Sequence, residues 1–246
     1  MPDAPASITQ AAVLCGGRGT RLRAVTGEGV PKVLVDVCGR PLLAYHLDLL
    51  RRHGVAEVVL CTGHLGEVVE AWVRRAAPEG LRVRCVREPR PLGTAGALAR
   101  VRGDLAERLF VLYGDVLARV DLGRMAAFHR ERGGEATLLT HPSDHPYDSD
   151  LVEADPATGR ITAFPGRPRP GEPFVNRTSA GLYVLERRIL EHVPADRPSD
   201  FGREVFPARL AAGAALFAYD SDEFARDLGT PERWARVCED VRRGRV

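Results

Sequence analysis

Near its start the chain reads Ala11-Ala12-Val13-Leu14-Cys15-Gly16-Gly17-Arg18-Gly19-Thr20-Arg21-Leu22, an apolar segment that leads directly into a glycine-rich turn. The apolar residues predict a buried strand over 11–15, and glycines at its carboxyl end let backbone N–H groups approach an anion closely. The sequence does not match the motifs of two common phosphate-binding loops. A dinucleotide fingerprint would need glycine where Leu22 stands, and a G-x-x-x-x-G-K-[ST] loop fails because the only lysine, Lys32, follows a proline. The turn therefore predicts a phosphate-binding loop of another kind.

Short apolar runs alternate with amphipathic stretches through the first half of the chain, which is the pattern of parallel strands joined by crossover helices. The further strands that we expect there cover 57–62, 82–87, 109–113 and 136–140. The expected helices cover 42–53, 65–76, 94–101 and 121–132, the last of them capped by Asp121. This alternation predicts an α/β fold with a mostly parallel sheet and flanking helices.

After His141 the sequence becomes rich in proline, glycine and aspartate, with brief strands expected at 151–154, 160–164 and 180–185. No linker long enough to separate two domains intervenes, so we expect one domain over 1–246 with this region as a β extension of the sheet. A closing helix is expected over 231–243 and should pack against the sheet.

The composition narrows the class of protein. The formal net charge of the 246 residues is only +2, and no continuous basic stripe is present, so nucleic acid is not an expected partner. Five scattered cysteines, never spaced as C-x-x-C, predict neither disulfides nor a structural zinc site. No signal sequence and no long apolar run is found, so we expect a cytoplasmic protein without membrane contact.

Several motifs occur in an order that resembles one enzyme family. G-G-x-G-T-R-L at 16–22 is followed by Pro31-Lys32 and by Gly39-Arg40-Pro41-Leu42. The further matches, in order, are Pro91-Leu92-Gly93-Thr94-Ala95-Gly96-Ala97, Tyr113-Gly114-Asp115, Gly159-Arg160-Ile161, Ala180-Gly181-Leu182-Tyr183, Val205-Phe206-Pro207 and Asp227-Leu228-Gly229-Thr230-Pro231-Glu232. Over nearly its whole length the chain resembles the sugar-1-phosphate nucleotidylyltransferases (nucleotide-sugar pyrophosphorylases), and within them the D-glycero-D-manno-heptose 1-phosphate guanylyltransferases.

The resemblance implies a GT-A-like (Rossmann-like) single domain. In it 1–135 would form a nucleotide-binding half, 136–230 a sugar-phosphate-binding half and 231–246 a C-terminal helix. The implied reaction is attack of a sugar 1-phosphate oxygen on the α-phosphorus of a nucleoside triphosphate, with release of pyrophosphate and formation of an NDP-sugar. The implied nucleotide-binding residues are Leu14, Cys15, Gly16, Gly17, Gly19, Thr20, Glu88, Gly93 and Thr94.

Arg21 and Lys32 are the expected catalytic residues, because both substrates are polyanions that must be neutralised and aligned. A guanidinium grips phosphate oxygens through paired hydrogen bonds, and a compact ammonium suits a single crowded oxygen. Asp115 and Asp227 are expected to hold Mg²⁺, as the matching pair does in the family, because Mg²⁺ prefers oxygen ligands. The plainer alternatives are that Arg21 faces solvent, that Asp115 is a turn residue and that Asp227 caps a helix.

Glu88 stands where family members that transfer thymidylyl or uridylyl groups place a glutamine. A carboxylate only accepts hydrogen bonds, so it cannot donate to a thymine carbonyl, whereas guanine offers two adjacent donors. The sequence therefore favours GTP as the nucleotide. The alternative is that Glu88 merely pairs with Arg87 or Arg90.

The sugar is expected to bind near the polar segment 141–150, which resembles the corresponding loop of the heptose 1-phosphate guanylyltransferases. The expected sugar-phosphate-binding residues are Asp150, Arg167, Asn176 and Ser179. Two departures leave the sugar open: the family's F-x-E-K-P is Phe164-Pro165-Gly166-Arg167-Pro168 here, and its asparagine before A-G-[IL]-Y is Ser179. Mannose 1-phosphate or another hexose 1-phosphate remains an alternative. The segment could also be a plain solvated loop, or imitate a metal site with His141, Asp144 and His145.

Two other functional classes compete with this one. A glycosyltransferase of similar architecture would use an NDP-sugar as donor and would want a D-x-D sequence after its strand, where this chain has Gly114-Asp115-Val116-Leu117. A non-catalytic sensor of nucleotide sugars should have lost the charged catalytic set, which is present here. A homo-oligomer is possible.

Overall fold

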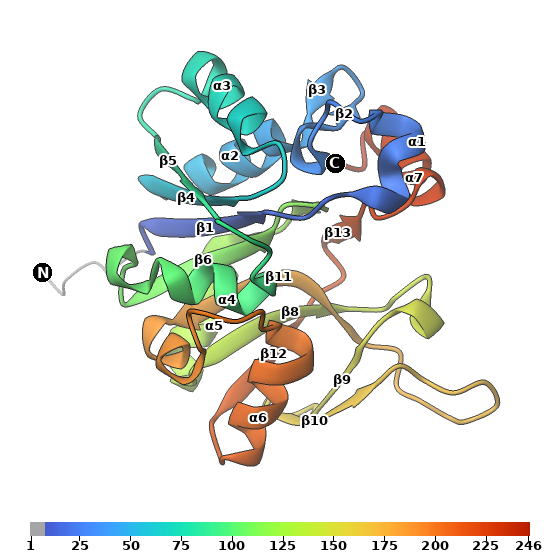
Figure 1. The fold of residues 1–246 in the computed structure, drawn as a ribbon. Helices are drawn as coiled ribbons and strands as arrows, with labels where there is room; N and C mark the ends of the chain where they lie inside the picture. The colour runs from blue at the N-terminus through green and yellow to red at the C-terminus, as the bar shows by residue number, and fades with distance from the viewer. Residues whose placement is uncertain (1–7) are drawn as a thin grey trace, which may run out of the picture.

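The computed structural model describes residues 8–246 and is built on a nine-stranded sheet with the order β10-β9-β11-β6-β1-β4-β5, in which β8 also pairs with β11, and β12 pairs with β8 (Figure 1). β1 (Gln10–Cys15) lies between β4 (Glu57–Thr62) and β6 (Arg108–Tyr113), and β5 (Arg82–Arg87) lies outside β4. All of these pairs are parallel. β1, β4 and β6 are buried on both faces, which is why they appear in the sequence as continuous apolar runs.

The second half of the chain extends this sheet with mainly antiparallel strands. β11 (Thr178–Glu186) is antiparallel to β6 and also to β8 (Ala136–His141), and so joins the two halves. β9 (Leu151–Ala154) meets β11 at Thr178 only and is antiparallel to β10 (Ile161–Gly166). β12 (Leu216–Asp220) runs parallel to β8 at the far edge. The predicted α/β fold with a β extension is confirmed.

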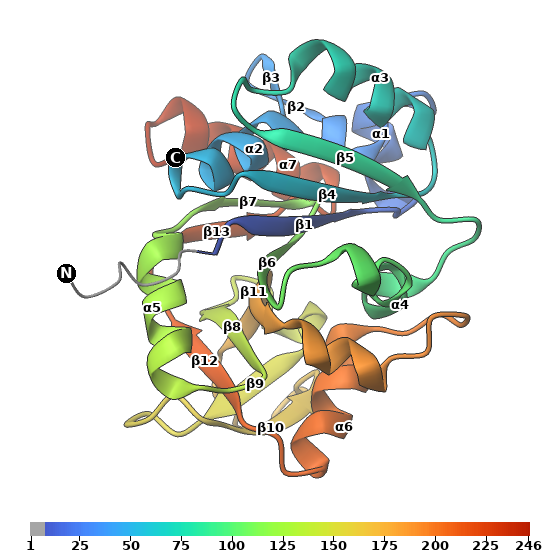
Figure 2. The same cartoon turned by 90° about the vertical axis from the view of Figure 1, so that its left-hand side faces the viewer.

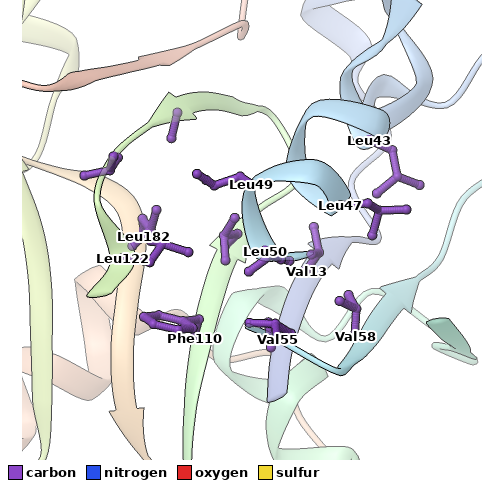
Figure 3. Close-up of a cluster of buried hydrophobic side chains, with 14 of the residues drawn as sticks. Val13, Leu43, Leu47, Leu49, Leu50, Val55, Val58, Phe110, Leu122 and Leu182 are labelled. Atoms are coloured by element: carbon purple, nitrogen blue, oxygen red, sulfur yellow. The ribbon is translucent and has the colours of Figure 1, made fainter. Parts of the chain in front are cut away.

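Alternate residues of β1 face opposite layers of helices. Val13 is fully buried in a cluster that includes the apolar side of α2 (Leu42–Arg52) (Figure 3). Ala12 belongs to a separate cluster beneath α4 (Gly93–Arg100). Figure 2 shows α2 and α3 (Gly66–Ala76) on one side of the parallel strands and α4 on the other. The core therefore consists of two layers with β1 at their centre.

Further helices cover the extension. α5 (Leu122–Arg132) begins as predicted after Asp121, whose side chain accepts a hydrogen bond of 3.0 Å from the N–H of Arg124. α6 (Phe206–Ala211) continues a π-helical turn, Phe201–Val205, and packs against β10. Within residues 8–246, no helix has the length and apolar character needed to cross a membrane.

Two short sheets lie beside the main one. β7 (Val116–Arg119) is antiparallel to β13 (Phe224–Asp227), and β2 (Asp36–Val37) forms a hairpin with β3 (Arg40–Pro41). α7 (Pro231–Arg242) makes its main contacts with β2 and β13, so the prediction that it packs on the main sheet is wrong. Its apolar side joins a third buried cluster that includes side chains of the hairpin. This corner, with the short α1 (Arg23–Thr26) beside α7, is visible in Figure 1.

Candidate active site

The carboxyl ends of β1 and β6 open onto a cavity of about 420 Å³. Such an edge is where ligands bind in open α/β sheets. All residues predicted to bind nucleotide line this cavity, namely Leu14, Cys15, Gly16, Gly17, Gly19, Thr20, Glu88, Gly93 and Thr94. Both predicted catalytic residues, Arg21 and Lys32, line it as well.

The glycine-rich turn is shaped by close backbone contacts. Gly114 lies so near to β1 that a Cβ there would be 2.7 Å from the carbonyl oxygen of Leu14. Gly19 has a φ of 60°, a left-handed conformation that glycine adopts without steric cost, and it precedes the 3₁₀ turn Thr20–Leu22. Leu22 is fully buried, so this turn places the neighbouring Arg21 at the rim of the cavity.

Glu88 lies in the nucleotide cavity with one carboxylate oxygen already used. Its Oε2 accepts a hydrogen bond of 2.9 Å from the N–H of Leu92, whereas Oε1 lies against Gly16. Burial raises the pKa of the half-buried Glu88 carboxyl, which the Leu92 hydrogen bond offsets only in part. The alternative that Glu88 pairs with a neighbouring arginine is wrong, because Arg87 pairs with Glu67 and Arg90 donates to the carbonyl oxygen of Asp196.

Lys32 and Asp115 form an ion pair at the junction of the loop and the sheet. The Lys32 Nζ lies 2.5 Å from Asp115 Oδ2, and only 15% of the lysine side chain is exposed. Lys32 starts the 3₁₀ turn Lys32–Leu34 after Pro31, and its methylene chain packs against Gly19. The single ammonium of the chain is thus fixed beside the glycine-rich turn and the end of β6.

A second and larger cavity, of about 900 Å³, continues from the first toward the β extension. The two cavities share the wall residues Arg21, Tyr113, Asp115 and Asp200. Three of the four predicted sugar-phosphate residues, Asp150, Arg167 and Ser179, line the second cavity. A ligand that occupies both cavities would therefore pass directly by Asp115.

Asn176 is the exception among the predicted sugar-phosphate residues. Its Oδ1 accepts a hydrogen bond of 3.1 Å from the N–H of Ser143, and its Nδ2 donates one of 2.9 Å to the carbonyl oxygen of Ser143. Asn176 lines neither cavity. Both ends of its amide instead hold the segment 141–150 in place, so its predicted contact with substrate stays a prediction.

Asp115 and Asp227 are brought together by the small β7–β13 sheet. Asp227 is paired with Val116 in that sheet, and the N–H of Leu228 donates a 2.8 Å hydrogen bond to the carbonyl oxygen of Asp115. Both aspartates line the larger cavity. The predicted metal pair therefore shares one wall, although the two residues are far apart in sequence.

Asp227 is held by several donors. Its Oδ1 accepts from Arg233 Nη1 at 2.9 Å and from the N–H of Gly229 at 2.8 Å, and its Oδ2 lies 3.0 Å from His145 Nε2. Burial alone would raise the pKa of Asp227, but Arg233, together with Gly229 and His145, lowers it below its ordinary value. Asp227 is therefore an anion at neutral pH.

The donor set at this wall suits Mg²⁺. No group of three or more His, Cys, Asp or Glu side chains that could hold a metal occurs within residues 8–246, which argues against the alternative site of His141, Asp144 and His145. Mg²⁺ usually takes one or two carboxylates and fills its other positions with phosphate oxygens and water. The carboxylates of Asp115 and Asp227 meet that demand next to a cavity that can admit phosphates.

Several charged residues of the larger cavity were not predicted from the sequence. Asp200 accepts a hydrogen bond of 2.9 Å from Thr94 Oγ1 and caps the turn Phe201–Val205, but no local pattern marks it. Asp148 and Arg233 both line this cavity and form an ion pair of 2.7 Å. Arg233 follows directly on the recognised motif that runs from Asp227 to Glu232, so its position next to that motif was the available signal.

With this geometry in place, the comparisons assign the family. The sequence model described as "Nucleotidyl transferase" matches residues 10–244, and the chain belongs to that family. It is 36% identical over 236 residues to the mannose-1-phosphate guanylyltransferase of Mycobacterium tuberculosis, covering 95% of this chain and 65% of the relative. It is also 36% identical over 228 residues to the probable mannose-1-phosphate guanylyltransferase 3 of Oryza sativa subsp. japonica, covering 90% of this chain and 62% of the relative. The chain therefore spans less than two thirds of these relatives' length.

Solved structures share the fold. HddC from Yersinia pseudotuberculosis matches with a TM-score of 0.81 at 22% identity, covering 95% of this chain and 100% of that chain. Its complex with GMP-PN matches with a TM-score of 0.79 at 24% identity over the same shares of the two chains. At this level of identity the likeness establishes a shared architecture.

Proposed function

We propose that this protein transfers a guanylyl group from GTP to a sugar 1-phosphate of manno configuration and releases pyrophosphate. The observation that carries the proposal is Glu88, whose Oε1 lies in the nucleotide cavity without an arginine partner. A carboxylate in that position suits the adjacent N1–H and N2 amine donors of guanine. The names of the curated relatives, mannose-1-phosphate guanylyltransferases, support the same nucleotide and the same ring configuration.

The reaction needs charge neutralisation more than proton transfer. A bond forms between a phosphate oxygen of the sugar 1-phosphate and the α-phosphorus of GTP, and the bond from that phosphorus to the bridging oxygen breaks as pyrophosphate leaves. The second pKa of a phosphate monoester lies near ~6, so the nucleophile is mostly dianionic at neutral pH. No general base is required, and cations placed at the phosphates supply the catalysis.

Lys32 and Arg21 are the cations that we assign to the reacting phosphates. Lys32 Nζ would exchange Asp115 for an oxygen of the α-phosphate, where it neutralises the charge that builds up in the pentavalent transition state. Arg21 stands at the rim shared by both cavities and would hold the triphosphate through paired hydrogen bonds.

Mg²⁺ is the cofactor that we propose, with Asp115 and Asp227 as its protein ligands. When bound, the ion supplies positive charge that orients and neutralises phosphate oxygens. Asp227 is anionic and fixed by Gly229, so its carboxylate is ready to act as a ligand. Calorimetric titration of the purified protein with magnesium should detect binding in the wild type. The substitutions Asp115→Asn and Asp227→Asn should each weaken that binding.

The sugar would lie in the larger cavity. Arg167 is placed to pair with its phosphate, and Asp150 and Ser179 offer acceptors to its hydroxyl groups. The polar segment 141–150 favours D-glycero-D-manno-heptose 1-phosphate by resemblance, and the curated relatives favour mannose 1-phosphate. Both sugars share the manno ring, so we propose a substrate with that ring. The assay below includes both sugar 1-phosphates.

The test is a pyrophosphate-release assay in which GTP, dTTP, UTP, CTP and ATP are each combined with a panel of sugar 1-phosphates, with and without magnesium. We expect release only with magnesium, fastest with GTP and with mannose or the heptose as sugar. Faster release with UTP or dTTP overturns the nucleotide assignment. Absence of release with every pair, despite binding of nucleotide, would favour the non-catalytic sensor.

A further inference from the structure

Three arginine side chains converge on one aspartate in the larger cavity. Asp148 Oδ2 lies 2.7 Å from Arg233 Nη2 and 3.6 Å from Arg21 Nη1, and Asp148 Oδ1 lies 3.4 Å from Arg167 Nη2. All four residues line the cavity. They come from four separate segments of the chain, so only the fold brings them together.

The arginines of this cluster outnumber the oxygen atoms that they share. Arg21 and Arg233 both face Asp148 Oδ2, because a carboxylate has only two oxygens. Arg167 also lies 3.8 Å from Asp150, and Arg233 also donates to Asp227. A phosphate group has three terminal oxygens and nearly twice the charge of a carboxylate, so it would match three converging guanidinium groups better than Asp148 does.

The contacts of Asp148 can be exchanged at low cost. Its side chain is 39% exposed, and exposed ion pairs contribute little net stability because both partners are well hydrated when apart. The hydrogen bond from Arg233 holds the pKa of Asp148 below its usual range, so the residue is anionic whenever substrate is present. Asp148 therefore competes with an incoming anion by charge and remains accessible to it.

We propose that Arg21, Arg167 and Arg233 form one subsite for the phosphoryl group of the sugar 1-phosphate, with Arg21, which lines both cavities, bridging from this group to the triphosphate, and that Asp148 occupies this subsite until the substrate displaces it. Arg233 is then a substrate-binding residue, and Asp148 acts as an internal competitor that lowers affinity for phosphate. The naming of the sugar 1-phosphate rests on the proposed function, whereas the anion subsite itself does not.

The test compares variants by titrating inorganic phosphate without nucleotide or magnesium, at constant ionic strength, and following the ³¹P NMR signal. Asp148→Asn should bind phosphate about three- to tenfold more tightly, because the competitor loses its charge. Arg233→Met should bind it at least about tenfold more weakly, with Arg233→Lys between the two, because a charge-assisted hydrogen bond is lost.

Asp144→Asn is the matched control. Asp144 lies in the same segment and carries the same charge, but it pairs with Arg226 at 2.6 Å and Arg236 at 2.5 Å instead of the three clustered arginines. Its removal should change phosphate affinity by less than about twofold through general electrostatics. Thermal unfolding checks that each variant is folded, and Asp148→Ser replaces Asp148→Asn if that variant does not fold.

Equal affinities of wild type, Asp148→Asn and Asp144→Asn would overturn the proposal, as would unchanged affinity in Arg233→Met. The pyrophosphate-release assay on the wild type separates the two levels of inference. If the wild type turns over GTP and a sugar 1-phosphate but Asp148→Asn leaves phosphate affinity unchanged, the proposed subsite is rejected and the proposed function is retained. Tighter phosphate binding in Asp148→Asn without turnover of any pair supports the subsite and rejects the function.

Discussion

Lys32 occupies a place that an arginine could not fill in the same way. Its ammonium is a compact charge on a flexible chain, and it reaches a single carboxylate oxygen of Asp115 in a position where only 15% of the side chain is exposed. A planar guanidinium at that point would present a wider fork between the glycine-rich turn and the end of β6. Every other lysine-or-arginine position of the chain is an arginine, which fits a requirement for a compact ammonium at this one position.

Replacing Lys32 with methionine should abolish most of the turnover and leave the fold intact. Loss of one cation at the reacting phosphate is expected to reduce kcat by about a hundredfold or more, since such groups contribute roughly 3–4 kcal/mol to transition-state stabilisation. Pyrophosphate release measures the loss, and circular dichroism with thermal unfolding checks the fold. Near-normal kcat in a folded Lys32→Met variant would remove Lys32 from the mechanism.

Replacing Glu88 with glutamine should change the choice of base. The amide places a donor against the guanine donors, so kcat/KM for GTP should fall by about ten- to a hundredfold, as expected for loss of a hydrogen bond to a charged group. UTP and dTTP should gain relative to GTP. The panel of nucleotides used for the wild type measures this change, and an unaltered preference for GTP would show that Glu88 does not read the base.

Ionisation of Glu88 should also make GTP binding depend on pH. The folded-state pKa of this carboxyl is raised by burial, and guanine needs the ionised form, so affinity should be lost as pH falls through that raised pKa, at a higher pH than for an exposed glutamate. Glu88→Gln should lack this part of the profile. Equilibrium titration of GTP between pH 4.5 and 8, for wild type and variant in parallel, tests the expectation.

At the scale of elements, α7 carries Arg233 to the cavity, and its N-cap fixes where the helix begins. Thr230 Oγ1 accepts a hydrogen bond of 3.3 Å from the N–H of Arg233. Thr230→Ala should lower the free energy of unfolding by about 1 kcal/mol, which is typical of a lost N-cap, whereas Thr230→Ser should keep most of it. Urea denaturation of the three proteins makes the comparison, and equal stability would show that Pro231 alone starts the helix.

The elements that the sequence predicted well are those with a local signature. β1, β4 and β6 are buried on both faces and appear as apolar runs, and α5 has an aspartate cap and a glycine stop. The strands β2, β3, β7, β12 and β13, two to five residues long, were missed. In β13 the residues Phe224, Arg226 and Asp227 are only partly buried, so pairing with β7 rather than periodicity makes this segment a strand.

For the whole molecule, two buried histidines tie stability to pH. Burial lowers the pKa of His46 and of His129, in the second case despite Glu186 nearby. Just below the ordinary histidine pKa, the unfolded chain then binds more protons than the native one. The free energy of unfolding should therefore fall as pH drops from about 7.5 to 5.5. The loss is up to about 1.4 kcal/mol for each unit by which burial lowers a histidine pKa. Urea denaturation at several pH values measures this slope.

His46 offers a way to assign part of that slope. Its Nε2 lies 2.6 Å from the carbonyl oxygen of Val116, while its Nδ1 is a buried atom without a hydrogen-bond partner among the described residues. Protonation would bury a second donor with no acceptor. His46→Gln should reduce the dependence of the free energy of unfolding on pH. His64→Gln, at an exposed position, is the control and should leave this dependence unchanged. An identical slope in wild type and His46→Gln would exclude His46 as a source.

The residues that line the smaller cavity could be predicted from the sequence, and those of the larger cavity only in part, for one physical reason. The glycine-rich turn is continuous in sequence, so the residue types from Leu14 to Thr20 are enough to identify it. The larger cavity is lined by many segments that are far apart in the sequence, and side-chain partners such as Asp148 and Arg233 are set by their convergence. The closeness of Asn176 to Ser179 in the sequence does not reveal that its amide faces Ser143.

The seam between β6 and β11 limits how far the two halves of the sheet can move relative to each other. Five paired positions, from Leu182 opposite Leu112 to Glu186 opposite Arg108, stitch the parallel half of the sheet to its antiparallel half. Hinge bending across this seam would break a row of backbone hydrogen bonds, so the spacing of the two cavities is set when the chain folds. Adaptation to substrates is left to the side chains and surface segments around an otherwise rigid frame.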